Sequence, residues 1–285
     1  MKHVVSFSGG RTSAYLVYLM EQKRKHEGWD VDYVFMDTGA EHPKTYEFIK
    51  NVVEHFGIEL VCLKAEISQA EGVGVTPKLI AIADIGWDMT VWREMVKKYG
   101  APYNPGGAFC TDRMKTTPYK KYCDQVYGKD QYTSWLGIRV DEKRRLKPRH
   151  GYKYLAEISS MDKNQIIGWW RDQPFDLDID EWLGNCVFCI KKGINKVAVA
   201  AKQEPELMAE FNATLGYASP EKRNSGGEMY RGKLSLEGIA KLHEDQDVEE
   251  IVKTMRYRRG CAVQDGESCE VFGCQGDLFE SEEVL

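Results

Sequence analysis

The sequence has little of what a secreted or membrane-bound chain needs. Its apolar runs are short, Leu79–Ala83 (LIAIA) being typical of the longest, against the roughly 18 residues of a membrane span. Met1, Lys2 and His3 lead directly into an apolar strand, which leaves no room for the segments of a secretory leader. Internal repeats and low-complexity tracts are absent too. We therefore expect a cytoplasmic, globular protein with no membrane partner.

Cysteine, by contrast, is not scarce: the 285 residues include eight. A chain of this length forms one large domain or a domain with an appendage. In a protein without a leader, cysteines are more often metal ligands, catalytic thiols or buried apolar residues than parts of a disulfide framework. Cys62 lies in an apolar stretch, so we expect it in the core.

Lys and Arg are missing from the last 25 residues, where seven acids lie. The net charge of the chain is −5, so residues 1–260 carry +2 and the tail carries −7. The basic residues gather in two stretches, Thr111–Lys121 and Arg139–His150. Such stretches either form a solvated face or bind an anionic, phosphorylated or polyanionic ligand.

The first 65 residues alternate between apolar strands and amphipathic helices. Apolar runs predict strands over His3–Phe7, Val31–Met36, Ile58–Leu63 and Thr133–Ile138, and helices over Ser13–Lys25 and Pro43–His55. Strands of continuous apolar character that alternate with helices predict an α/β fold with a doubly wound, mostly parallel sheet.

The rest of the chain reads as helical and irregular. Helical stretches are predicted over Pro77–Ala83, Thr90–Tyr99, Asp162–Arg171, Gly193–Gln203 and Leu234–Leu242. We divide the chain into a nucleotide-binding domain over residues 1–190, a helical extension over 191–260 and an acidic, cysteine-bearing tail over 261–285.

A loop suited to phosphate lies between the first strand and the first helix. It consists of Ser8, Gly9, Gly10, Arg11, Thr12 and Ser13. Glycines allow positive φ and close approach, a helix start directs N–H groups outward, and hydroxyls add donors. The loop matches neither the Walker A pattern nor the dinucleotide pattern, and an ordinary Gly-Gly turn is the alternative.

This S-G-G-x-x-S loop resembles that of the adenine nucleotide α-hydrolase-like, or PP-loop, superfamily with its Rossmann-like fold, and most of all the phosphoadenosine phosphosulfate reductase family. Three further segments are similar to that family. They are D-T-G…P-x-T-Y-x-F from Asp37, C-x-x-x-x-K-x-x-P from Cys110 and G-x-R-x-D-E-x-x-R from Gly137. The four segments stand in family order within residues 4–190.

The resemblance implies a role for each matching residue. The nucleotide would be bound by Ser8, Gly9, Gly10, Arg11, Thr12, Ser13, Asp37, Thr38, Gly39, Gly137 and Arg139. Arg139 and Arg145 would clamp the anionic groups during catalysis, because guanidinium forks match phosphate and sulfate oxygens. Asp141 and Glu142 would either orient these arginines or hold Mg²⁺. Many ATP-cleaving members have Asp where Thr12 stands, which leaves ATP and phosphoadenosine phosphosulfate both open.

The C-x-x-C pair Cys186 and Cys189, with the distant Cys110, resembles the ligands of a 4Fe–4S cluster in this family. The family's Cys-Cys pair is Phe109-Cys110 here. We place the fourth ligand at Cys274, with Cys123, Cys261 and Cys269 as alternatives. Zinc, a redox dithiol and buried thiols are the other interpretations of the same spacing.

Cys269 faintly resembles the reductase nucleophile, although the following Gly is absent. An acidic neighbourhood raises the pKa of a thiol, so Cys269 would need basic residues nearby. Three hypotheses follow. The first is a thiol-dependent reductase acting on an adenylyl sulfate compound, with a thiol reductant as partner. The second is an ATP pyrophosphatase that adenylates and thiolates a nucleic acid, with a sulfur donor protein as partner. The third is a non-catalytic nucleotide-binding partner in an assembly.

Overall fold

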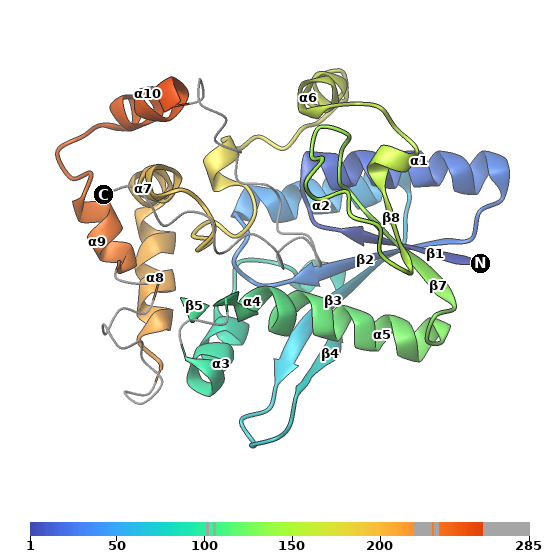
Figure 1. The fold of residues 1–285 in the computed structure, drawn as a ribbon, viewed down its shortest axis with the longest axis horizontal. Coiled ribbons are helices and arrows are strands. Elements are labelled where there is room, and N and C mark those ends of the chain that lie inside the picture. Colours follow the sequence, from blue (N-terminus) through green and yellow to red (C-terminus); the bar gives the residue numbers. More distant parts are fainter. Residues whose placement is uncertain (101–102, 105–106, 219–229, 231–233, 259–285) are drawn as a thin grey trace.

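The computed structural model describes residues 1–100, 103–104, 107–218, 230 and 234–258, and its centre is a six-stranded sheet (Figure 1). The strands lie in the order β4-β3-β2-β1-β7-β8, and all pairs are parallel except β3 with β4. The strands are β1 (Lys2–Phe7), β2 (Val31–Asp37), β3 (Leu60–Ile67), β4 (Val75–Ile80), β7 (Tyr132–Leu136) and β8 (Tyr152–Tyr154), and a separate hairpin joins β5 (Tyr103–Asn104) to β6 (Gly107–Ala108).

Helices cover both faces of the sheet. Over one face lie α1 (Arg11–Glu27), α2 (Pro43–Phe56) and α6 (Lys163–Arg171), and over the other lies α5 (Thr117–Tyr127). The remaining described helices are α3 (Thr90–Tyr99), α4 (Phe109–Thr111), α7 (Ile194–Gln203), α8 (Pro205–Leu215), α9 (Leu236–Lys241) and α10 (Val248–Arg258). Between α4 and α5 the chain makes a π-helical turn over Asp112–Thr116. The predicted α/β fold with a mostly parallel, doubly wound sheet is thereby confirmed.

Alternating side chains of the central strands explain the two layers. Val5 and Phe7 of β1 belong to the core under α1, α2 and α6, whereas Val4 packs with residues of α5 on the other face. Tyr119 and Cys123 of α5 are fully buried there. Successive side chains of a strand point to opposite faces, so a strand apolar at every position needs a helical layer on each side.

The antiparallel edge strand β4 corrects one prediction. Pro77–Ala83 reads as helical in the sequence, but residues 75–80 pair with β3, and Pro77 lies opposite Ala65. Pro lacks an N–H donor and is tolerated on a sheet edge, which is where β4 lies. Only a short 3₁₀ turn over Ile82–Asp84 remains of the expected helix.

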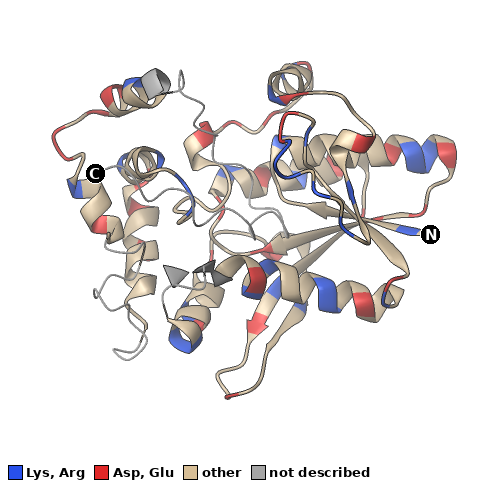
Figure 2. Cartoon of the chain, in the orientation of Figure 1, with Lys and Arg blue, Asp and Glu red and all other residues tan. Residues whose placement is uncertain are grey.

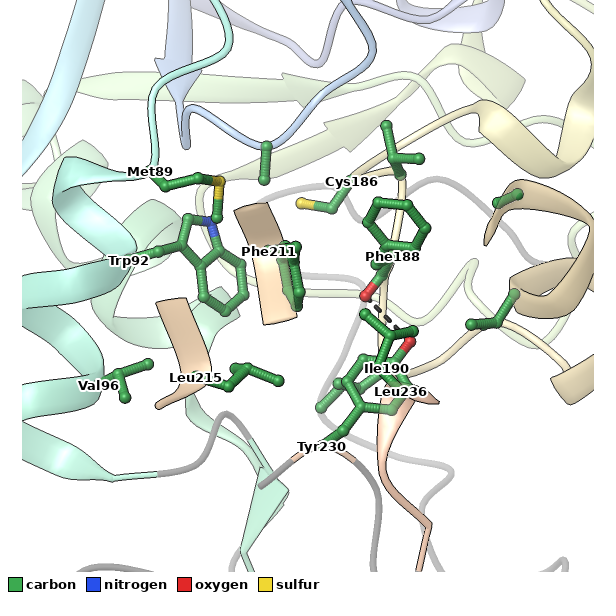
Figure 3. Packing of buried hydrophobic residues seen from close by; sticks show 14 of the residues in the cluster. Met89, Trp92, Val96, Cys186, Phe188, Ile190, Phe211, Leu215, Tyr230 and Leu236 are labelled. Atoms are coloured by element: carbon green, nitrogen blue, oxygen red, sulfur yellow. Dashed lines mark hydrogen bonds between the residues drawn. The ribbon is translucent and has the colours of Figure 1, made fainter. Parts of the chain in front are cut away.

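The helices after residue 190 form a second core with α3. Trp92 of α3 contacts Phe211 of α8, with ring centroids 5.1 Å apart, and Phe211 also contacts Phe188 (Figure 3). The hydroxyl of Tyr230 donates to the carbonyl of Phe188 at 3.0 Å. This packing joins the segment that carries Cys186 to the helical part of the chain. Among the described helices, none is long and apolar enough to cross a membrane.

Candidate active site

The Ser8–Ser13 loop follows β1 at the carboxyl edge of the parallel sheet, and its last three residues form the start of α1. Ser13 Oγ donates to the carbonyl of Gly10 at 3.0 Å and accepts from the Ser8 N–H at 3.2 Å and from Ser8 Oγ at 2.9 Å. The two serines thus fix the loop internally. Open α/β sheets bind their ligands at this edge, and the helix start adds a favourable dipole for anions.

Gly9 lets the loop lie directly on α2. Its φ is +81°, and a Cβ there would lie 2.9 Å from Ile49 Cδ1 and 3.1 Å from Thr45 Cγ2. An L side chain rarely adopts such a φ. Gly9 therefore sets the position of the loop against the helix.

Arg139 lies across the loop. Its Nη1 donates to Thr12 Oγ1 at 3.1 Å, and its Nε and Nη2 donate to the two carboxylate oxygens of Asp141 at 2.9 and 3.1 Å. Burial alone would raise the pKa of Asp141, but the hydrogen bonds and charge of Arg139 lower it. The bidentate pair orients the guanidinium towards the loop.

Glu142 holds the second arginine. This buried carboxylate accepts from the Arg139 N–H at 2.9 Å, and it pairs with Nη1 of Arg145. Of the two roles inferred for Asp141 and Glu142, the structure therefore favours orientation of the arginines. Arg145 itself lies outside the cavity lining, and its contact with an anion remains a prediction.

A cavity of about 340 Å³ opens over the loop. The predicted residues that line it are Ser8, Gly9, Gly10, Arg11, Thr12, Ser13 and Arg139, joined by Glu41, Thr45, Asp141, Glu142, Lys163, Ile166, Ile167, Leu177, Ile179, Asp180, Glu181, Gly184 and Asn185. Its size lies within the usual range for small-molecule sites, about 300–1,000 Å³. The segment 177–185 supplies the far wall, which the motif-based reading of the sequence missed.

Arg11 ties the loop to that far wall. Its Nε donates to Asp176 Oδ1 at 2.6 Å, and its guanidinium also contacts the carbonyl of Leu177. Trp170 Nε1 donates to the Arg11 carbonyl at 2.9 Å. Arg11 thus lines the cavity with its charge already paired.

The Asp37–Gly39 turn lies beside the cavity rather than in its lining. Asp37 is fully buried, and its Oδ1 accepts from the Gly39 N–H at 2.8 Å and from the Tyr46 hydroxyl at 3.0 Å. Burial raises the pKa of Asp37, against the opposing charge of Lys64 3.5 Å away. The turn shapes the wall that follows it, while direct nucleotide contact by Asp37, Thr38 and Gly39, and by Gly137, stays a prediction.

Glu41 and Thr45 are cavity residues that the sequence analysis missed. Glu41 is 2% exposed, and its Oε1 lies 3.4 Å from Lys115 Nζ and 3.6 Å from Cys186 Sγ. Its Oε2 and the Thr45 hydroxyl have no hydrogen-bond partner. Their position just after β2, inside the D-T-G…P-x-T segment, was the available signal.

Three of the predicted metal ligands line one small pocket behind this wall. Cys110, Cys186 and Cys189 lie there together with Thr38 and Lys115. Glu41 and Cys186 form a β-bridge, and the Val187 N–H donates to the Ala40 carbonyl at 2.9 Å. The thiol pocket and the cavity therefore share a wall made by the residues after β2.

Lys192 adds a buried amine next to these thiols. Burial lowers the pKa of Lys192 to about 8, although the nearby cysteines and Glu41 oppose this shift. Its Nζ donates to the carbonyl of Val187 at 2.9 Å. A cation close to a thiol favours the thiolate.

The described residues do not fit a four-iron cluster as they stand. The thiol pocket measures about 20 Å³, room for about one water molecule. Within the described ranges no group of three or more Cys, His, Asp or Glu is arranged to hold a metal ion. Cys274, the predicted fourth ligand, and Cys261 and Cys269 lie outside the described residues.

Two other cysteines are core residues. Cys62 of β3 is 1% exposed, as predicted, and Cys123 of α5 is fully buried among Val4, Val34 and Tyr119. Burial raises the pKa of both thiols to about 12. Cys123, an alternative fourth ligand, thus belongs to a different core cluster from the thiol pocket.

The two basic stretches have different surroundings. In the first, Lys115 is buried against Glu41, and Lys121 donates to the carbonyl of Val75 at 2.8 Å. The second forms the loop between β7 and β8, where basic residues follow one another closely (Figure 2). Its exposed members are Lys143, Arg144, Lys147, Arg149 and His150. Only the second stretch offers a broad charged surface.

Comparison with known proteins gives the family. Residues 2–151 match the model of the phosphoadenosine phosphosulfate reductase domain. The nin region protein ORF290 of Escherichia phage lambda is 49% identical over 285 residues, which is 98% of each chain. A Methanocaldococcus jannaschii protein is 31% identical over 49% of this chain and 23% of its own.

A reductase is also among the relatives. The phosphoadenosine 5′-phosphosulfate reductase of Alteromonas mediterranea is 35% identical over 68 residues, which cover 24% of this chain and 26% of the reductase. The family model spans more than half of the sequence. With its phosphate loop at the carboxyl edge of an α/β sheet, the chain belongs to the phosphoadenosine phosphosulfate reductase domain family of PP-loop nucleotide-binding proteins.

Proposed function

We propose that this chain is an enzyme that binds an adenine nucleotide in the cavity and uses thiols for sulfur chemistry on an adenylyl sulfate compound. One observation supports this most. The cavity over the Ser8–Ser13 loop shares a wall with a pocket lined by Cys110, Cys186 and Cys189. A site for an activated nucleotide next to thiols suits chemistry at sulfur.

The loop and Arg139 would bind the anionic part of the nucleotide. Backbone N–H groups at the start of α1 and the Thr12 hydroxyl are the donors, and the fork of Arg139 supplies the charge. Arg145, held by Glu142, would add the second clamp on the sulfate. Glu41 and the segment 177–185 would close the sides of the cavity and exclude water.

Cys269 is the proposed nucleophile. Its thiolate would attack the sulfur of the phosphosulfate, forming an S–S bond while the S–O bond to the phosphate breaks. The nucleotide then leaves as its phosphate, and the enzyme carries an S-sulfonate. A dithiol reductant attacks the cysteine sulfur and releases sulfite. The sulfate sulfur gains two electrons, and the dithiol becomes a disulfide after a second exchange.

Cys269→Ser tests this assignment. Because the substitution removes the nucleophilic sulfur and leaves the cavity intact, we expect sulfite release to fall at least 100-fold while nucleotide affinity stays within twofold. The measurement is sulfite release from phosphoadenosine phosphosulfate with a dithiol reductant, together with calorimetric titration of the nucleotide. Ser268→Ala, the matched control, should keep full turnover. Equal turnover in both variants would exclude Cys269 as the nucleophile.

A second candidate function is ATP cleavage coupled to thiolation of a nucleic acid. The exposed basic loop between β7 and β8 supports it, because Arg139 and Asp141, at the start of this loop, also line the cavity. Clustered cations attract a nucleic-acid backbone. Pyrophosphate release from ATP that DNA or tRNA stimulates would support this candidate, with a sulfur donor protein as the further partner. A purified chain with no turnover of either nucleotide would leave the role of a binding partner in an assembly.

An iron–sulfur cluster is the remaining proposal, with Cys110, Cys186, Cys189 and Cys274 as its four ligands. Because the thiol pocket has room for about one water molecule, the described thiols would have to move apart to bind it. The support is the gathering of the first three at one pocket. Protein purified without oxygen should contain iron and sulfide and absorb near ~400 nm, and Cys186→Ala should lose this band. Zinc at the same thiols would instead give a colourless protein with one bound zinc, and a dithiol would give neither metal.

A further inference from the structure

The described residues that line the cavity carry no excess of positive charge that could attract a polyanionic ligand. The charged residues that line it are five carboxylates, Glu41, Asp141, Glu142, Asp180 and Glu181, and three cations, Arg11, Arg139 and Lys163. The described lining thus carries no excess of positive charge. Because each of these cations lies within 4 Å of a carboxylate, its attraction for a ligand is already partly offset.

A nucleotide with several phosphate or sulfate charges needs further compensation in such a site. Charges taken out of water are unfavourable unless they are paired and hydrogen-bonded. Mg²⁺ is the common counter-ion of nucleotide phosphates, and proteins usually hold it through one or two carboxylates and the phosphates themselves. A divalent cation that enters with the nucleotide would restore the charge balance.

Glu41 is the carboxylate in the best position to bind such a cation. It lines the cavity, it is 2% exposed, and its Oε1 lies 3.4 Å from Lys115 Nζ and 3.6 Å from Cys186 Sγ. Its Oε2 has no partner, which for a buried carboxylate oxygen is unfavourable by about 1–3 kcal/mol or more. Thr45, in the first turn of α2, also lines the cavity with a hydroxyl that has no hydrogen-bond partner. The two unpaired oxygens lie on the same wall.

Of the other carboxylates that line the cavity, three are paired with cations, and the exposed Asp180 accepts from Gln203 Nε2 at 3.0 Å. Asp141 and Glu142 hold Arg139 and Arg145, and Glu181 lies 2.9 Å from both Lys163 and Lys196. Burial would raise the pKa of Glu181, yet the two lysines lower it to about 2. Its negative charge is therefore already paired with these lysines. Among Glu41 and the three paired carboxylates, Glu41 alone has a carboxylate oxygen without a partner.

We propose that the cavity takes its nucleotide as a complex with a divalent cation, and that Glu41 is the protein carboxylate that binds this cation, directly or through water. The proposal rests on nucleotide binding in the cavity. It is consistent with the absence of a three-ligand metal group among the described residues, because the phosphates supply the remaining ligands.

Calorimetric titration of the full chain tests the proposal. The probe is α,β-methylene ATP, which is not cleaved between the α and β phosphates, added with Mg²⁺ or with EDTA. We expect binding at least tenfold tighter with Mg²⁺. Glu41→Gln keeps the side-chain shape and removes the charge, so this ratio should fall to about one. Glu47→Gln, an exposed acid on α2 six residues further along the chain, should keep the wild-type ratio.

The outcomes separate the two levels of inference. Equally tight binding with Mg²⁺ and EDTA would overturn the cation proposal and leave nucleotide binding standing. Absence of binding in both conditions, with no binding of adenosine phosphosulfate either, would overturn the proposed function and the cation with it. A wild-type ratio in Glu41→Gln would remove Glu41 as the ligand.

A second measurement does not depend on whether Glu41→Gln folds. Free Mn²⁺ gives a six-line electron paramagnetic resonance signal that decreases when the ion binds. From this decrease, we expect the wild-type protein with nucleotide to bind Mn²⁺ at least tenfold more tightly than nucleotide alone does. Pulsed spectra should show couplings to phosphorus, because the cation contacts the phosphates. Mn²⁺ affinity equal to that of nucleotide alone would overturn the proposal.

Discussion

Arg139→Ala is expected to weaken nucleotide binding about 100-fold. The guanidinium contacts Thr12 of the phosphate loop and is aimed by Asp141 and Glu142. Loss of charge-assisted hydrogen bonds of this kind is worth about 1.5–3 kcal/mol, and each 1.4 kcal/mol is tenfold in affinity. Calorimetric titration with ATP and with adenosine phosphosulfate measures the change.

Arg139→Lys separates the charge from the geometry. A lysine keeps the positive charge but lacks the planar fork that pairs with Asp141 while reaching the loop. We expect roughly tenfold weaker binding, between the wild type and Arg139→Ala. Lys147→Ala, an exposed cation of the same loop, is the matched control and should change affinity by less than twofold. Equal losses in Arg139→Ala and Lys147→Ala would mean that general attraction, and not a specific contact, binds the anion.

The predictable part of the site is the part built from local sequence. The Ser8–Ser13 loop follows an apolar strand and precedes a helix, so its position at the carboxyl edge of the sheet follows from the chain order alone. Arg139 follows β7, which pairs directly with β1. Because neighbouring parallel strands end at the same edge, the loop and Arg139 meet once β7 lies beside β1, a pairing that the sequence analysis did not predict.

The missed part depends on contacts between distant segments. Asp176 reaches Arg11 across 165 residues, and the segment 177–185 closes the cavity without a recognisable motif. Glu204 likewise lies 3.1 Å from the buried ring of His42, which caps α2. Such pairs depend on how the helical part of the chain packs against the sheet. The hydrophobic periodicity of the sequence does not predict this packing.

The incorrect prediction of a helix over Pro77–Ala83 has a related cause. The short apolar run there fits both a helix and a strand, and periodicity cannot decide between them. Pairing of residues 75–80 with β3 decides it in the fold. The sequence did contain one warning, since Pro77 would interrupt a helix interior but is tolerated in an edge strand.

Gly39→Ala is the single substitution for which we expect the largest loss of stability, because Gly39 lies in the wall between the cavity and the thiol pocket. Gly39 has a φ of +72°, and a Cβ there would lie 1.9 Å from the backbone carbonyl oxygen of Asp88. A left-handed conformation is unfavourable by about 1–2 kcal/mol for an L residue, and overpacking adds about 1–3 kcal/mol. The free energy of unfolding should therefore fall by about 2–5 kcal/mol, measured by urea denaturation.

Gly86→Ala is the control for this substitution, because it lies on the same segment as Asp88 but has no atom within 4 Å of its Cβ position. It also keeps the backbone N–H of Gly86, which helps to lower the pKa of the buried Asp37. We expect its stability to stay within about 1 kcal/mol of the wild type, as for most changes that create no clash. If Gly39→Ala were equally harmless, Asp88 would have to move away from the turn. Thr38 and Glu41 would then move relative to Cys186, and nucleotide binding would report that shift.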